Sequence, residues 1–170
     1  MYYVCRGHLP QFKGFKMSIL VTGAAGFIGS NFVHFLINNT TEQLVSYDAL
    51  TYAGHKANLD GLPADRHTFV HGNICDAKAL ETVLTQHNIQ KIVHFAAESH
   101  VDRSIASAAP FIQTNVLGTQ CLLDAAKQHN IQRFVHVSTD EVYGSLSETE
   151  PAFTEEHPIQ PNSPYAASKA

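Results

Sequence analysis

Short apolar runs alternate along this chain with stretches in which apolar residues recur three or four positions apart. Runs of this length indicate buried strands, and the wider spacing indicates helices with one apolar face. The runs are residues 18–21, 44–47, 67–71, 91–96 and 133–138. Strands that alternate with helices in this way predict an α/β fold built on a doubly wound parallel sheet.

The first apolar run leads directly into a glycine-rich turn that opens a helix. Gly23 suits a tight turn that a side chain would block, and Gly26 lets backbone N–H groups approach a phosphate. Gly29 lets the helix pack closely on the strand, and the helix presents its positive end to a pyrophosphate. Strand, turn and helix together predict a dinucleotide-binding site.

The second apolar run ends at Asp48, about 20 residues after this turn. A carboxylate at that position can accept hydrogen bonds from the ribose hydroxyls of an adenosine. Neither Arg nor Lys lies between Asp48 and Gly54 to receive a 2′-phosphate, so the pattern favours NAD over NADP. The alternative is an ordinary strand-to-helix turn in which Asp48 caps a helix.

The composition is that of a globular protein. A length of 170 residues, with 44% hydrophobic and 15% charged residues, predicts one domain with a sizeable core. The net charge of -4 offers no basic surface for nucleic acid. The apolar runs fall short of the ~20 residues that a membrane helix requires.

Cysteine and histidine usage predicts neither a disulfide framework nor a metal site. Cys5, Cys75 and Cys121 form an odd set without metal-ligand spacing, so we expect reduced thiols and a cytoplasmic location. His94 and His136 fall inside predicted strands, and we interpret them as partnered core or strand-edge residues.

The two ends of the chain lead to two further expectations. Residues 1–16 show no periodicity, and we interpret them as an upstream start or a cloning scar that forms a disordered extension. An NAD-binding, Rossmann-like domain is expected over residues 17–170. The sequence stops at Ala170 in the first turns of a helix, so we expect this domain to be truncated at its C-terminus and to lack a substrate domain.

Three predicted strands end at Gly23, Ala96 and Ser138, and these ends meet in one crevice of a doubly wound sheet. Tyr165 and Lys169 are four residues apart and therefore share one face of a helix. An ammonium and a nicotinamide cation would lower the pKa of a buried phenol, and the phenolate could then take a proton from a sugar hydroxyl. The alternative is a surface pair without a role in chemistry.

Thr139, Asp140 and Glu141 directly follow the last predicted strand. Adjacent carboxylates in a crevice can divide their work, one as a protonated acid and the other as an ionised base. The alternative is that one of the two acids caps the following turn.

These segments resemble the extended short-chain dehydrogenase/reductase superfamily and, within it, the dTDP-glucose 4,6-dehydratases. The resemblance covers residues 17–170, roughly the first half of such an enzyme, and it rests on residues 23–29, 48–54, 96–104, 138–144 and 163–170. The Thr-Asp-Glu triplet at 139–141 is its specific signal, because sugar-nucleotide epimerases of the superfamily lack the acid pair.

The resemblance implies a lyase that holds NAD throughout a redox-neutral cycle and acts on dTDP-glucose. Tyr165, assisted by Lys169 and Thr139, would oxidise the sugar at C4. Glu141 would remove the C5 proton, and Asp140 would protonate the departing C6 hydroxyl. The product would be a 4-keto-6-deoxy sugar for deoxysugar pathways such as rhamnose biosynthesis.

The resemblance also implies contacts for each part of the cofactor. Beyond Gly23, Gly26 and Gly29, the implied contacts are Phe27, Ile28, Asp48, Leu50, Thr51, Asn73, Ile74, Ala96, Ala97, Ser99, Thr114, Tyr165 and Lys169. Ser99, Thr139, Asp140 and Glu141 would face the substrate. The sequence departs from the family at Ala24, where a second glycine is common, and at Asn73, where an aspartate is usual.

Two rival functions remain open. One is another NAD-dependent sugar-nucleotide enzyme, either a 4-epimerase or a dehydratase for a different nucleotide sugar, and the other is a non-catalytic NAD-binding module. The full-length parent is expected to be a homodimer without nucleic-acid or membrane partners. We expect residues 1–170 alone to aggregate and to have little or no dehydratase activity.

Overall fold

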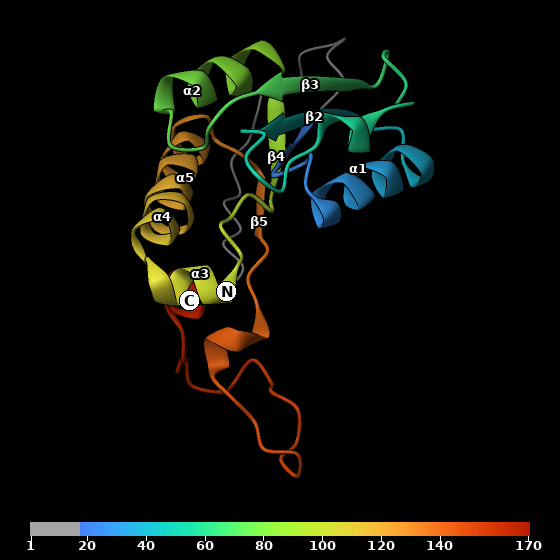
Figure 1. Ribbon diagram of the computed structural model, residues 1–170. Helices are drawn as coiled ribbons and strands as arrows, with labels where there is room; N and C mark the ends of the chain where they lie inside the picture. The colour runs from blue at the N-terminus through green and yellow to red at the C-terminus, as the bar shows by residue number, and fades with distance from the viewer. Residues whose placement is uncertain (1–17) are drawn as a thin grey trace.

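The computed structural model describes residues 18–170, so the expected extension over residues 1–16 lies outside the described part of the chain. A five-stranded parallel sheet forms its centre, in the order β3-β2-β1-β4-β5 (Figure 1). The strands are β1 (Ser18–Thr22), β2 (Gln43–Asp48), β3 (His67–His71), β4 (Ile89–His94) and β5 (Arg133–His136). The order reverses between β1 and β4, which confirms the predicted doubly wound sheet.

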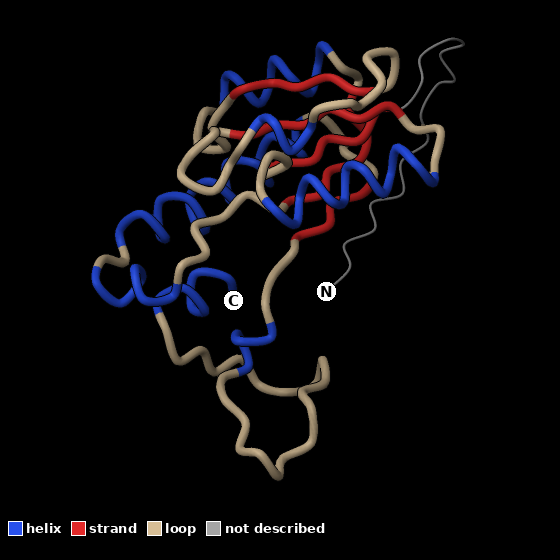
Figure 2. Tube along the Cα trace, turned by 45° about the vertical axis from the view of Figure 1, so that its right-hand side comes forward, coloured by secondary structure: helices blue, strands red, loops and turns tan. Residues whose placement is uncertain are grey.

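Helices cover both faces of the sheet (Figure 2). On one face α1 (Phe27–Asn39) packs over a hydrophobic cluster that includes Ile19 and Val21. On the other face α2 (Ala77–Gln86) and α5 (Thr119–Gln128) pack over a second cluster, which includes Leu20. Successive β1 residues therefore enter opposite cores, as a strand buried on both faces requires.

The last two strands end earlier than the sequence predicted. The apolar pattern extended β4 to residue 96 and β5 to residue 138, whereas the strands end at His94 and His136. Single hydrogen bonds continue each ladder, from the Phe95 N–H to the Thr22 carbonyl (3.0 Å) and from the Val137 N–H to the His94 carbonyl (3.1 Å). The chain then diverges from the sheet, and this divergence opens the crevice at the point where the strand order reverses.

The long helix that precedes β5 is irregular in a way that the sequence did not predict. α4 (Ala109–Phe111) continues through a π-helical segment, η2 (Ile112–Gly118), into α5. Three further short helices are η1 (Lys56–Leu59), α3 (Val101–Ala106) and η3 (Asp140–Tyr143).

After η3 an irregular loop extends away from the sheet, and α6 (Pro164–Lys169) then returns against α3 (Figure 1). None of the helices within residues 18–170 has both the length and the apolar character needed to cross a membrane.

Candidate active site

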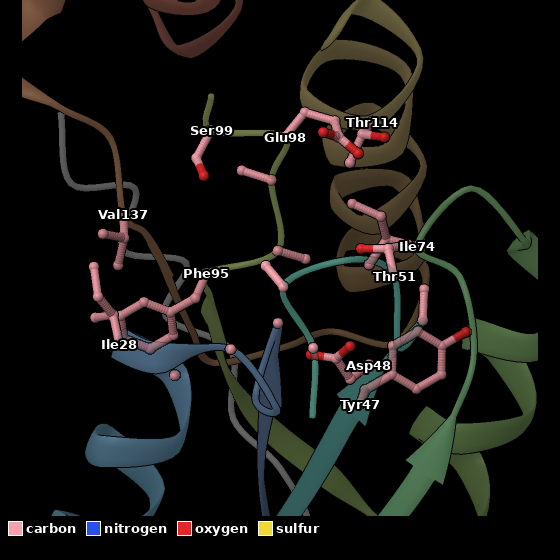
Figure 3. A pocket seen from close by; sticks show the side chains of 18 of the residues that line it. Ile28, Tyr47, Asp48, Thr51, Ile74, Phe95, Glu98, Ser99, Thr114 and Val137 are labelled. Carbon is pink, nitrogen blue, oxygen red and sulfur yellow. The ribbon is translucent and has the colours of Figure 1, made fainter. Parts of the chain in front are cut away.

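A cavity of about 370 Å³ lies at the carboxyl ends of the strands (Figure 3). Gly23 follows β1, Asp48 ends β2, and Ala96 and Ser138 follow β4 and β5, so the predicted convergence of strand ends is observed. Every cofactor contact that the sequence suggested lines this cavity except Leu50.

Close backbone packing explains two of the glycines in the turn. Gly23 has φ 66°, and a Cβ built on it would lie 2.5 Å from the Ala96 nitrogen. A Cβ on Gly29 would overlap the carbonyl oxygen of Gly23. A side chain at either position would push β1 away from β4 or from α1, so the turn depends on both glycines.

The first turn of α1 opens onto the cavity. Gly26 is the N-cap and supplies no capping side chain, so the first N–H groups of the helix remain for a ligand. Phe27 and Ile28 lie in the wall with 82% and 63% of their surface exposed. Ala24, the departure from the family pattern, is fully buried beneath α1 and leaves this opening clear.

Asp48 is almost fully buried, and each of its carboxylate oxygens accepts a backbone hydrogen bond. The Ala25 N–H donates to Oδ2 at 2.9 Å, and the Leu50 N–H donates to Oδ1 at 2.7 Å. Leu50 adopts φ 50° and lies outside the cavity wall, so its contact with the cofactor stays a prediction. Each carboxylate oxygen keeps a lone pair for a hydroxyl of a ligand.

Tyr47 and Asn73 shape the far end of the cavity. The Tyr47 hydroxyl donates to the Asn73 carbonyl at 3.0 Å, and burial raises the pKa of Tyr47 to about 12. The Asn73 side-chain oxygen accepts from the Cys75 N–H at 2.9 Å. This bond fixes the orientation of the Asn73 amide and leaves its NH₂ group and one oxygen lone pair for a ligand.

Lys169 is 5% exposed and lines the cavity. Burial lowers the pKa of its ammonium to about 8. The only ion pair described between residues 18 and 170 joins Lys91 to Glu42, so Lys169 has no carboxylate partner there. Ser138 donates to the Lys169 carbonyl at 2.6 Å and fixes this end of α6 against β5. A buried, unpaired ammonium in a cavity wall is suited to bind hydroxyl groups of a ligand.

Tyr165 also lines the cavity, and without a ligand its pKa is raised. Burial raises the pKa of Tyr165, the negative charges of Glu141 and Asp140 raise it further, and a hydrogen bond with Thr139 lowers it. The sequence predicted a lowered pKa from Lys169 and a nicotinamide cation. Burial and the two carboxylates favour the neutral phenol, so formation of a phenolate depends on additional positive charge from a ligand.

Thr139 caps η3 and lies beside Tyr165 together with both acids. Its hydroxyl accepts from the Glu141 N–H at 3.3 Å, while neither acid caps the turn, which excludes the alternative that an acid serves as the cap. The triplet is absent from the cavity wall, yet the charges of both acids influence the Tyr165 phenol.

The sequence analysis missed Asn115, a buried residue of η2. Its Oδ1 accepts from the Glu98 N–H at 2.8 Å, and its Nδ2 donates to the Glu98 carbonyl at 2.9 Å and to Ser168 Oγ at 2.8 Å. The Ser104 hydroxyl, likewise buried, accepts from the Tyr165 N–H at 3.1 Å. A polar residue within an apolar helical pattern was the available signal. These bonds connect the wall formed by residues 96–99 to α6.

His94 is a fully buried, partnered histidine, as the sequence suggested. Thr22 Oγ1 lies 2.6 Å from Nδ1, and Thr119 Oγ1 lies 3.0 Å from Nε2. Burial lowers the pKa of His94 to about 3, and His136 and Lys169 contribute to this lowering. The imidazole is therefore neutral and connects β1, β4 and α5 behind the cavity. Residues 18–170 contain no cluster of side chains suited to a metal ion.

Comparison with known proteins identifies similar sequences and structures. A family profile described as GDP-mannose 4,6 dehydratase matches residues 20–170. The dTDP-glucose 4,6-dehydratase 1 of Escherichia coli K12 is 48% identical over 91% of this chain and 48% of its own length. The chain thus spans about half the length of the curated relatives that it matches.

Solved structures of dehydratases and epimerases are similar to this chain over most of its length. A dTDP-glucose 4,6-dehydratase from Streptomyces venezuelae, crystallised with NAD, superimposes with a TM-score of 0.84 at 53% identity, over 90% of this chain and 48% of the other. The UDP-glucose 4-epimerase of Thermus thermophilus, also in complex with NAD, gives a TM-score of 0.82 at 33% identity, over 90% and 47%.

Proposed function

The chain belongs to the GDP-mannose 4,6-dehydratase family, and from this membership we propose that it carries the NAD-binding and catalytic residues of a dTDP-glucose 4,6-dehydratase. The acid pair Asp140 and Glu141 beside Tyr165 carries this proposal. Oxidation of a sugar hydroxyl needs one base, whereas loss of water from the neighbouring carbons needs a second base and an acid. The site holds groups for both tasks.

The cavity fits a dinucleotide in three respects. Backbone packing excludes side chains at Gly23 and Gly29, which keeps the turn before α1 open for a pyrophosphate at the helix N-terminus. The free lone pairs of Asp48 suit the hydroxyls of one ribose, and the unpaired ammonium of Lys169 suits those of the other. Bound NAD would supply the hydride acceptor and donor.

Tyr165 would accept the proton of the sugar's C4 hydroxyl. Its raised pKa keeps the phenol protonated until positive charge enters the cavity, so this base would form only in the loaded site. Thr139 favours the phenolate through its hydrogen bond, and Ser104 fixes the backbone from which the phenol projects.

Glu141 would remove the C5 proton, which a C4 ketone makes acidic, and Asp140 would protonate the leaving C6 hydroxyl. These are proposals from the family resemblance, and they require opposite protonation states of two adjacent acids. Thr139 contacts both residues, since its hydroxyl donates to Asp140 Oδ1 at 3.3 Å and accepts from the Glu141 N–H at 3.3 Å, so protonation of Asp140 would require a change at this bond in the loaded site.

The protein as it occurs in its source cells provides the test. It is incubated with dTDP-glucose and NAD, and the product is analysed by mass spectrometry and NMR. A product lighter by one water, with a C4 ketone and a C6 methyl group, supports the proposal. Glu141→Gln is expected to abolish the loss of water, and Asp65→Asn, a change at an exposed acid outside the cavity wall, is expected to leave it unchanged.

A 4-epimerase is the nearest alternative, because the Thermus enzyme shares the fold. Epimerisation would use Tyr165 and Lys169 but would leave Asp140 and Glu141 without a task. A product of unchanged mass with an inverted C4 hydroxyl supports this alternative. NAD binding without sugar-nucleotide binding supports a non-catalytic module.

Location and assembly are further proposals. The unpaired thiols of Cys75 and Cys121 support a reducing compartment, and we propose the cytoplasm. Exposed apolar side chains along η2 and α5, namely Ile112, Val116, Leu117 and Leu123, support a homodimer of the parent protein. The mass of the native assembly, measured by light scattering, tests the second proposal.

A further inference from the structure

Tyr52 and Arg103 make a contact that none of the predicted roles uses. The Arg103 guanidinium carbon lies 4.6 Å from the centre of the Tyr52 ring, which is a cation–π distance. Tyr52 lies in the segment that follows β2, and Arg103 lies in α3, which follows β4. The two residues are 51 positions apart in sequence, so the contact depends on the tertiary fold.

The segments that carry the two residues adjoin separate walls of the cavity. Thr51 and Ala53, on either side of Tyr52, line it, and Ser99, just before α3, lines it from another segment (Figure 3). Neither Tyr52 nor Arg103 belongs to the lining, so their contact lies outside the cavity and connects the two walls. A dinucleotide that extends from Asp48 toward Tyr165 would pass between these walls.

The segment around Tyr52 is tethered to the domain only near its ends. The Leu50 N–H donates to Asp48 at 2.7 Å, and the His55 N–H donates to the Ala25 carbonyl at 3.0 Å. Between these points the hydrogen bond described is local, from the Gly54 N–H to the Thr51 carbonyl at 3.1 Å. The stack on Arg103 therefore restrains the exposed middle of the segment.

Arg103 is available for this task. It is exposed, and within residues 18–170 no carboxylate forms an ion pair with it. Its backbone carbonyl accepts from the Ser107 N–H at 2.9 Å, which fixes the end of α3. The guanidinium is thus free to stack on an aromatic face, which arginine does better than lysine.

We propose that Tyr52 and Arg103 form a clasp across the cofactor cleft that slows the release of bound dinucleotide. The inference rests on the proposed NAD-binding function and goes beyond it by assigning cofactor retention to two residues outside the binding wall. An enzyme that reoxidises its own cofactor in each cycle gains from slow exchange. Separation of the two walls requires the stack to break, so the strength of the stack adds to the barrier for release.

The dissociation rate of NADH from the full chain tests the clasp without relying on catalysis. Protein loaded with NADH is mixed with excess NAD, and the loss of bound-NADH fluorescence is followed in a stopped-flow instrument. Arg103→Met keeps an unbranched stem and removes the cation, and Tyr52→Leu removes the ring. Each is expected to raise the dissociation rate about two- to fivefold, the range for an exposed cation–π pair.

Three further variants separate the clasp from general effects. Tyr52→Phe retains the ring and is expected to release NADH at the unsubstituted rate. Arg133→Met makes the same change at an exposed arginine of β5 that does not line the cavity, and it is expected to have no effect. The double variant Tyr52→Leu with Arg103→Met is expected to be no faster than either single variant, because each change alone already breaks the stack.

The outcomes separate the clasp from the function on which it rests. If the unsubstituted chain binds NADH and both single variants release it at the same rate as that chain, the clasp is overturned and the NAD-binding proposal stands. Multiplicative effects in the double variant also overturn the clasp, because they show independent contributions. If the unsubstituted chain fails to bind NADH, both proposals are overturned.

Discussion

Replacement of Gly23 by alanine tests whether close packing between β1 and β4 shapes the cavity. Gly23 and Gly61 both adopt a left-handed conformation, with φ 66° and 79°. Their surroundings differ, because a Cβ on Gly23 would lie 2.5 Å from the Ala96 nitrogen, whereas a Cβ on Gly61 would meet nothing within 4 Å. Gly61→Ala is therefore a matched control that shares the conformational strain and lacks the collision.

The expected difference follows from these contacts. Both substitutions carry the left-handed cost of roughly 1–2 kcal/mol, which the lower entropy of the unfolded chain offsets by about 0.4–1 kcal/mol. Only Gly23→Ala also forces backbone atoms of the turn and of Ala96 apart by roughly 1 Å, and overpacking of this kind costs about 1–3 kcal/mol. We expect Gly23→Ala to lower the free energy of unfolding by that much more than Gly61→Ala.

Urea unfolding followed by circular dichroism measures this difference, provided that the two variants have equal m-values. NADH titration is expected to show weaker binding for Gly23→Ala and unchanged binding for Gly61→Ala, since only the first change displaces the turn before α1. Equal losses of stability in the two variants would refute the argument that contact with Ala96, rather than backbone conformation, requires glycine at position 23.

Two further substitutions test the polar network behind the cavity. Asn115→Leu leaves both backbone groups of Glu98 without partners and is expected to reduce the free energy of unfolding by about 2–4 kcal/mol and to speed hydrogen exchange at the Glu98 amide. Asn39→Leu, at an exposed helical asparagine with one hydrogen bond, is expected to change the free energy of unfolding by less than about 0.5 kcal/mol. Equal effects at the two sites would contradict the stabilising role of the hydrogen bonds between Asn115 and Glu98. For His94 the folded pKa of about 3 lies below the ordinary value of 6.5, so the unfolded chain binds the extra proton and stability is lost as the pH falls from 6.5 toward 3. His94→Gln is expected to have a lower free energy of unfolding at pH 7. As the pH falls, this free energy is expected to decline less steeply than in the unsubstituted protein, by up to about 1.4 kcal/mol per pH unit. Equal slopes in the two proteins would show that His94 does not cause the loss of stability at low pH.

Features set by neighbours in sequence were predictable. Asp76 precedes the apolar-periodic residues Leu80, Val83 and Leu84, a pattern that predicts a helix N-cap, and its side chain accepts from the Ala79 N–H at 3.0 Å, three residues ahead. The crevice was predictable for a different reason, because the topology of a doubly wound sheet alone places Gly23 and Ala96 side by side. Neither prediction required knowledge of how remote side chains pack.

Features set by remote neighbours were not predictable. The raised pKa of Tyr165 depends on its burial and on how close Glu141 and Asp140 lie, and the spacing along the chain determines neither. Asn115 finds its partners 17 positions earlier, at Glu98, and 53 positions later, at Ser168. Helical periodicity gives the face of a residue but not the loop that the face meets.

The π-helical segment η2 has a consequence for how this family can change in length. A π-helical turn holds one more residue than an α-helical turn, so such a segment corresponds to a single-residue insertion that the helix has accommodated. Deletion of one residue from 112–118 would return the helix to regular pitch with α4 and α5 on their axes, but Asn115 would turn away from Glu98. We therefore expect homologues that lack one residue in this helix to lack the asparagine as well. An alignment of homologues would then show a gap in the helix together with a different residue at the position of Asn115.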